Sequence, residues 1–183
     1  MLRRLLAFAT VALLLPAAAH AQGEMAEEDP FATAPVTWTP FGEAMKQAKA
    51  EGKPVVLHAY ATWCGWCQKF NREVFPDEDV KAMLDDRYIV SRINIESADS
   101  VAFRGGMLTE QELSGALGVR GVPAHVFFSP EGERLTLLPG FAPAEQFIHV
   151  LRYIADKGYD TESFEEYMER VMPKEEATPG SAG

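Results

Sequence analysis

The sequence predicts an α/β domain in which a mixed β-sheet has helices on both faces. Apolar runs that suit strands alternate with segments whose apolar residues recur at helical spacing. The run VVLHAYA (55–61) is apolar enough for a central strand covered on both sides. AHVFF (124–128) and RLTLL (134–138) are joined by the turn Ser-Pro-Glu-Gly (129–132), which is typical of an antiparallel hairpin. The order βαβ followed by ββα then implies the mixed sheet.

The other elements follow from the same periodicities. In chain order they are a helix from Phe41 that Gly52 ends, helices at 64–71 and 77–84, a strand at 88–95, and helices at 109–118, 143–157 and 164–171. The last helix is interpreted as a cover for the core, because its apolar stripe has to be buried. The stretch ESADSVAFRGGML (96–108) is interpreted as a long connection, either part of a partner surface or a spacer.

The first 21 residues have the pattern of a secretory signal peptide. Arg3 and Arg4 precede the apolar run 5–15, and Ala-His-Ala (19–21) fits a small-residue cleavage site. The run is shorter than the roughly 20 apolar residues of a membrane-spanning helix, so no stable membrane insertion is expected. The alternative is that the segment is retained as a membrane anchor. We therefore expect a periplasmic protein with a flexible leader at 22–35, one domain at 36–172 and a disordered tail at 173–183.

Composition argues against two classes of partner. Removing Arg3 and Arg4 from the 17 basic residues leaves 15, against 27 acidic ones, which gives a net charge of −12 with neutral histidines. A surface with this charge repels nucleic acid and anionic membranes. Neither is expected as a partner.

Both cysteines lie in ATWCGWCQKF (61–70), and four uses of Cys64 and Cys67 compete. A structural disulfide that closes so short a loop would stabilise the fold weakly. A zinc site needs about four ligands, and no histidine stands at metal spacing. Haem attachment requires a histidine where Gln68 stands. A redox pair fits better, because Cys64 is predicted near a helix N-terminus, where backbone N–H groups stabilise a thiolate.

Three motifs in this order resemble the thioredoxin superfamily. They are VVLHAYATWCGWCQKF, then GVRGVPAHVFF, then LPGFAP, and the resemblance covers about residues 36 to 157. KPVVLHAYATWC, EVFPDEDVKAML and VPAHVFFSPEGE are most similar to exported reductases, namely SoxW-like thioredoxins and the C-terminal domain of DsbD-type interchange proteins. The fold implied is thioredoxin-like, with an extra C-terminal helix.

The resemblance also implies roles for individual residues. Cys64 is expected to be the exposed nucleophile and Cys67 the buried resolving thiol, and the two form the Cys64–Cys67 disulfide in the oxidised protein. The residues implied in substrate binding are Trp63, Gly65, Trp66, Val122 and Pro123. Pro123 is expected to be cis, which would present the Val122 backbone to an extended client segment. Trp66 replaces the proline common in thioredoxins and the histidine common in oxidases, and for Trp63 and Trp66 a plain aromatic role is the alternative.

His58 stands where thioredoxins usually carry a buried aspartate that accepts the proton of the resolving thiol. A neutral imidazole with an unperturbed pKa of about 6.5 could do the same work. The alternative is a hydrogen-bonded core histidine without a catalytic role. Arg92 is interpreted as a solvated charge on its strand, a catalytic role being the alternative.

The predicted function is reduction of disulfides in exported client proteins, without metal or organic cofactor. The protein is expected to act as a monomer, and a membrane electron donor of the DsbD or CcdA type is expected to reduce it again after each reaction. A disulfide-introducing oxidase, an isomerase and a non-catalytic binding module on the same fold are the alternatives. The residues alone do not separate a reductase from an oxidase, because both use the same cysteine pair.

Overall fold

A computed structural model describes residues 35–172. The predicted signal peptide, all but the last residue of the leader, and the tail from 173 lie outside this range. The four strands of the larger sheet are, in spatial order, β2 (Ile89–Asn94), β1 (Val55–Tyr60), β5 (Ala124–Phe128) and β6 (Arg134–Pro139). β1 pairs with β2 in parallel and with β5 antiparallel, and β5 pairs antiparallel with β6. The predicted mixed sheet and its hairpin are confirmed.

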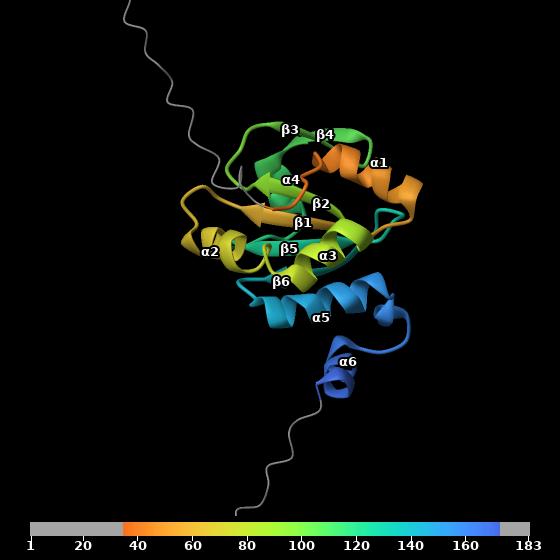
Figure 1. Ribbon diagram of the computed structural model, residues 1–183. Coiled ribbons are helices and arrows are strands. Elements are labelled where there is room, and N and C mark those ends of the chain that lie inside the picture. Colours follow the sequence, from red (N-terminus) through yellow and green to blue (C-terminus); the bar gives the residue numbers. More distant parts are fainter. Residues whose placement is uncertain (1–34, 173–183) are drawn as a thin grey trace, which may run out of the picture.

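Helices cover both faces of this sheet (Figure 1). One face carries α2 (Gly65–Glu73), α3 (Glu78–Arg87) and α5 (Ala144–Ala155), whose apolar side chains pack with Val56 and Phe127. The other carries α1 (Phe41–Glu51) and α4 (Glu110–Ala116), which pack with Leu57 and Val126. Successive side chains of a strand point to opposite faces, so β1 contributes to both cores and is buried along almost its whole length.

The helix boundaries follow from local capping. Gly52 ends α1 in the left-handed conformation at φ 68°, which glycine adopts without the steric penalty of a Cβ. The carboxylate of Asp77 accepts hydrogen bonds from the first turn of α3, and Thr109 and Glu112 form a capping box at the start of α4. The predicted helices are therefore present, with ends displaced by a few residues.

The stretch 96–108 is more ordered in structure than the connection we predicted. It contains β3 (Ser100–Phe103) and β4 (Gly106–Thr109), an antiparallel two-stranded sheet next to α1. The two residues of its turn, Arg104 and Gly105, both have positive φ, 49° and 82°, as a tight hairpin of this handedness requires. The connection is therefore a separate hairpin.

After α5, a short 3-10 helix η1 (Gly158–Asp160) leads to α6 (Phe164–Val171), which packs against α5. Tyr167 of α6 is buried, and its ring lies 5.3 Å from that of Tyr153 in α5. A capping box of Ser163 and Glu166 begins the helix. The prediction that the last helix covers the core is confirmed.

Candidate active site

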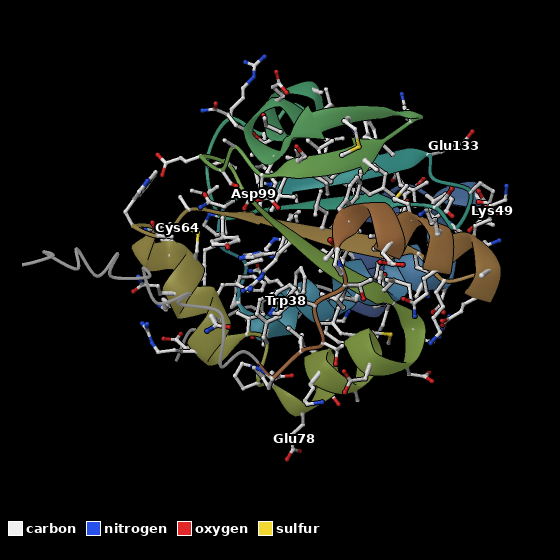
Figure 2. The ribbon with its side chains drawn as sticks, turned by 90° about the horizontal axis from the view of Figure 1, so that it is seen from above. Trp38, Lys49, Cys64, Glu78, Asp99 and Glu133 are labelled. Carbon is white, nitrogen blue, oxygen red and sulfur yellow. A yellow bond between two sulfur atoms is a disulfide. The ribbon has the colours of Figure 1, made fainter. Side chains whose placement is uncertain are left out.

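The two cysteines lie where the end of β1 leads into α2. Their sulfur atoms are bonded at 2.00 Å, with a Cα–Cα distance of 5.2 Å. Cys64 is the N-cap of α2, and its Sγ accepts a hydrogen bond from the backbone N–H of Cys67 at 3.0 Å. Figure 2 shows Cys64 at the start of α2, at the end of the molecule opposite Lys49. A helix N-terminus with an N–H directed at sulfur stabilises negative charge there once the disulfide is opened.

In the disulfide form both cysteines are buried. Cys64 has 3% of its surface exposed and Cys67 none, because Trp38, Tyr60, Ile95 and Val122 pack around the pair. The expectation of an exposed Cys64 is therefore wrong for this state. Cys64 is still the more accessible of the two.

Pro123 follows a residue that packs on the disulfide, and it has the predicted cis form. The Val122–Pro123 peptide bond is cis, and the Val122 side chain packs against the cysteine pair. The carbonyl oxygen of Pro123 accepts a hydrogen bond from the N–H of Gly140 at 2.8 Å. A groove of about 390 Å³ adjoins this segment, and Gly118, Gly121 and Leu137 are among its lining residues.

Two exposed tryptophans border the cysteines. Trp63 is 65% exposed, yet its indole N–H donates a hydrogen bond to Glu96 Oε2 at 2.9 Å. Trp66 is 58% exposed and packs on Phe141 at 5.3 Å between ring centroids. The ammonium group of Lys69 lies 5.2 Å from the Trp66 ring and 5.1 Å from the Phe141 ring, within the range of a cation–π interaction. Both aromatic side chains are thus held in place at the surface.

His58 is fully buried, and a second buried histidine lies beside it. Nδ1 of His58 and Nε2 of His125 are 2.9 Å apart, and neither residue is exposed. Burial lowers the pKa of His58 well below its usual value, with smaller contributions from His125 and Arg92, and burial also lowers the pKa of His125 to about 3. The expectation that His58 titrates near 6.5 is therefore wrong for this state, and both rings are neutral at physiological pH.

Arg92 is partly exposed on β2, and its charge lies over two aromatic rings. Its guanidinium lies 5.2 Å from the Trp38 ring and 5.6 Å from the Tyr60 ring, the same two aromatic residues that pack on the cysteine pair. The residue as a whole is half-buried on β2. This places a positive charge at the edge of the site, on the His58 side.

Comparison with known proteins agrees with this geometry. Residues 41–155 match the family model of the thioredoxin-like domain, which is well over half of the chain. The chain belongs to the thioredoxin-like family. It is 32% identical over 112 residues to the thiol:disulfide interchange protein DsbD of Ralstonia nicotianae, an alignment that covers 60% of the chain. To DsbD of Escherichia coli K12 it is 34% identical over 107 residues, or 57% of the chain.

These thioredoxin-like matches cover 17% of either DsbD protein, so the chain corresponds to a small part of those relatives. Among solved structures, a thioredoxin from Thermus thermophilus superposes with a TM-score of 0.55 and 28% identity. That superposition covers 67% of this chain and 89% of the thioredoxin. The fold is therefore thioredoxin-like, with the sheet, the helices and the cysteine pair in the arrangement described above.

Three further observations concern metal binding, membrane crossing and a residue between the cysteines. Within residues 35–172, no group of three or more His, Cys, Asp or Glu side chains is placed to hold a metal ion. The same range has no helix with the length and apolarity needed to cross a bilayer. Gly65 is exposed between the cysteines, and a Cβ there would meet no atom within 4 Å, so the described structure does not require glycine at this position.

Three residues of the site were missed by the sequence reasoning. His125 was counted only as part of an apolar strand, Glu96 as part of a connection, and Phe141 as part of the glycine motif after the last strand. The available signal for His125 was a polar ring inside the apolar run AHVFF. His58 gives the same signal inside the run VVLHAYA. Glu96 and Phe141 reach the site only through tertiary contacts.

Proposed function

We propose that this protein is a thiol–disulfide oxidoreductase that reduces disulfides of exported proteins in the periplasm. The observation that carries the proposal is the Cys64–Cys67 disulfide at the N-terminus of α2, packed against the segment of Val122 and cis Pro123. The similarity of the chain to thiol:disulfide interchange proteins supports the same chemistry. No organic cofactor or metal is needed, because a disulfide closes in one partner as it opens in the other.

In this proposal Cys64 attacks the client disulfide and Cys67 resolves the mixed disulfide. The hydrogen bond from Cys67 N–H to Cys64 Sγ and the α2 dipole favour the thiolate on Cys64. Cys67 is fully buried in the first turn of α2, a position that suits an intramolecular attack rather than a reaction with a client. His58, in the buried layer beneath α2, accepts the Cys67 proton during that attack.

The client segment is proposed to lie in extended form along Val122, where its backbone can pair as a short strand. Trp63, Gly65 and Trp66 would contact it from the cysteine side. Exposed aromatic surface of this kind is common where proteins bind other proteins. The Trp63–Glu96 hydrogen bond and the Trp66–Phe141 contact support this role, because a fixed side chain loses little conformational freedom on binding.

The proposed direction is reductive, and the protein is proposed to act as a monomer. A reductase in an oxidising compartment must receive electrons through the membrane, so we infer a donor of the DsbD or CcdA type. Trp66 supports this direction, because residue 66 then lacks the imidazole that would over-stabilise a Cys64 thiolate in an oxidase.

The cellular redox state of the pair tests the proposal. Acid quenching and alkylation of exported protein should find Cys64 and Cys67 mostly reduced in a strain that carries the donor, and oxidised when the donor is deleted. A pair that stays oxidised in the donor-containing strain would contradict the reductase and favour the oxidase. Full-length mass of the chain in the periplasmic fraction would contradict the cleaved signal peptide.

A further inference from the structure

His58 and His125 are directly opposite each other on two neighbouring central strands. They are register partners of the antiparallel pair β1–β5. Their ring centroids are 4.8 Å apart, and Nδ1 of His58 lies 2.9 Å from Nε2 of His125, a hydrogen-bond distance. Two fully buried imidazoles in hydrogen-bond contact are an uncommon way to fill an apolar core, since each polar ring requires a partner.

The pair shares aromatic neighbours with the cysteine site. The His58 ring is 5.7 Å from the Phe70 ring, and Phe70 follows Cys67 by one turn of α2, with both side chains fully buried. On its other sides His58 contacts Trp38 at 6.1 Å and Tyr60 at 6.2 Å, the two aromatic residues that pack on the cysteines. Trp38 and Tyr60 thus contact both His58 and the cysteine pair.

A hydrogen bond between two neutral imidazoles has two possible directions. If Nδ1–H of His58 donates to His125, Nε2 of His58 carries a free electron pair and can accept a proton. If Nε2–H of His125 donates instead, Nε2 of His58 carries a hydrogen and cannot act as a base. The direction of this one bond therefore decides whether His58 can do the work proposed for it.

The surroundings of His125 favour the first direction. Its ring lies 4.4 Å from the Phe70 ring and 4.9 Å from the Phe147 ring, and within residues 35–172 its Nδ1 has no hydrogen-bond partner. A hydrogen on Nδ1 can make a weak N–H···π contact with a neighbouring ring, whereas an unprotonated Nδ1 would be a buried acceptor without a donor. A hydrogen on Nδ1 leaves Nε2 of His125 as an acceptor, which receives Nδ1–H of His58.

We propose that His125 is a positioning residue for the resolving step, which holds His58 in the tautomer whose Nε2 accepts the proton of Cys67. The inference rests on the proposed thiol–disulfide exchange and deepens it. In the step, the Cys67 proton moves to His58 Nε2 while the Cys67 sulfur attacks Cys64. The Cys64–Cys67 bond forms, the bond between Cys64 and the client sulfur breaks, and the client sulfur leaves as a thiolate. Water then takes the proton from His58.

The electrostatics agree with a base that is charged only during the step. From β2, the positive charge of Arg92 opposes protonation of His58, while Tyr60 of β1 and Phe147 of α5 present neutral rings to the pair. In the disulfide form Cys67 has no charge to offset this. Once reduced, a Cys67 thiolate beside His58 stabilises the imidazolium, as in other buried thiolate–imidazolium pairs.

Substitutions of His125 with and without an acceptor test the proposal. His125→Gln keeps an acceptor near the position of Nε2, and His125→Leu removes it. The matched control is His149→Leu, a partly buried histidine of α5 that contacts Tyr167. The probe is the chromogenic disulfide dithionitrobenzoic acid. The reduced protein releases one coloured thiolate when Cys64 attacks and a second when Cys67 resolves the mixed disulfide, so the two steps are read separately.

Below about pH 8, we expect His125→Leu to slow the release of the second coloured thiolate about tenfold or more and to leave the first release unchanged. The rates of His125→Gln and of the His149→Leu control should stay within about threefold of wild type. The loss should shrink at high pH, where Cys67 ionises without a base. The His58→Leu/His125→Leu double variant should be no slower than His58→Leu. A wild-type second phase in His125→Leu would overturn the inference and leave the proposed function standing, whereas absence of both releases in wild type would contradict the function itself.

Nitrogen NMR of the reduced wild-type protein tests the same inference without any substitution in the core. Nδ1 of His58 and Nδ1 of His125 should carry the hydrogens, and Nε2 of His58 should have a pyridine-type shift. A hydrogen on Nε2 of His58 in the reduced protein would overturn the inference.

Discussion

The indole N–H of Trp63, the residue before Cys64, donates a hydrogen bond to the Glu96 carboxylate at 2.9 Å, although both side chains are exposed. The bond joins the segment before α2 to the segment after β2. Exposed polar contacts stabilise proteins little, so its effect on the free energy of unfolding should be small. Its consequence is the fixed position of an aromatic side chain beside Cys64.

Glu96→Ala should therefore slow exchange with a peptide disulfide while stability stays nearly constant. A loss of up to about 1 kcal/mol in client binding corresponds to about a fivefold lower second-order rate. Stopped-flow kinetics with a cysteine-bridged peptide measure it. Glu133→Ala is the control, because it removes an exposed carboxylate at the other end of the molecule (Figure 2). An unchanged rate in Glu96→Ala would mean that Trp63 needs no such support.

The two cysteines should differ in how they trap clients. Cys67→Ser should accumulate mixed disulfides through Cys64, several-fold above wild type, because the resolving thiol is missing. Cys64→Ser should trap almost none, since Cys67 is fully buried. Non-reducing gels of periplasmic extracts measure the adducts. Equal alkylation of Cys64 and Cys67 in the reduced native protein would count against the assigned roles.

The free energy of unfolding should fall more steeply in acid than protonation of carboxylates alone would cause, because two buried histidines also contribute. The unfolded chain protonates each histidine as the pH falls through about 6.5, whereas folded His125 has a pKa of about 3 and that of His58 is also well lowered. Between these values the unfolded state binds more protons, so stability present at neutral pH is lost as the pH falls. For His125, two pH units below 6.5 remove about 2.7 kcal/mol.

Urea unfolding at about pH 7 and about pH 4.5 tests this with His125→Gln. Carboxylates are common to both proteins, so the variant should lose about 2.7 kcal/mol less than wild type between the two pH values. Equal losses would show that His125 is already protonated in the folded protein, contrary to its burial.

The link between α5 and α6 should depend on a glycine. A Cβ at Gly158 would lie 2.7 Å from Cε2 of Tyr153, whose hydroxyl donates to the Glu162 carbonyl oxygen at 2.6 Å. Gly158→Ala must displace that ring and should lower the free energy of unfolding by about 1–3 kcal/mol. Gly115→Ala is the opposite control. Its Cβ meets no atom within 4 Å, and alanine in a helix stabilises by about 0.5–1 kcal/mol relative to glycine.

The sequence predicted the elements whose signal is local. The apolar run of β1, the Ser129–Gly132 turn and the stripe of α6 each identify one element from adjacent residues, and all three are present. The β3–β4 hairpin was missed because its four-residue strands are partly exposed and lack a strong alternation. Its one local signal was Arg104-Gly105, a turn that was interpreted as part of a loop.

The site was predicted only as far as single motifs reach. The cysteine pair and His58 follow from a contiguous stretch, but the His58–His125 bond depends on the register of strands that are 67 residues apart in sequence. The shift in the pKa of His58 likewise depends on burial by α2 and on Arg92 of β2. Periodicity carries no information about such pairings.

The reduction potential of the Cys64–Cys67 pair tests the central claim most directly. The protein is equilibrated with glutathione buffers of known potential, and the reduced fraction is read from alkylation. We predict a value near the thioredoxin end of the range, roughly −270 mV, from which electron donation to client disulfides is downhill. The Trp66→His variant should move the potential upward, because an imidazolium stabilises the reduced thiolate. A wild-type value near about −120 mV would contradict the account, since a protein with that potential oxidises its partners.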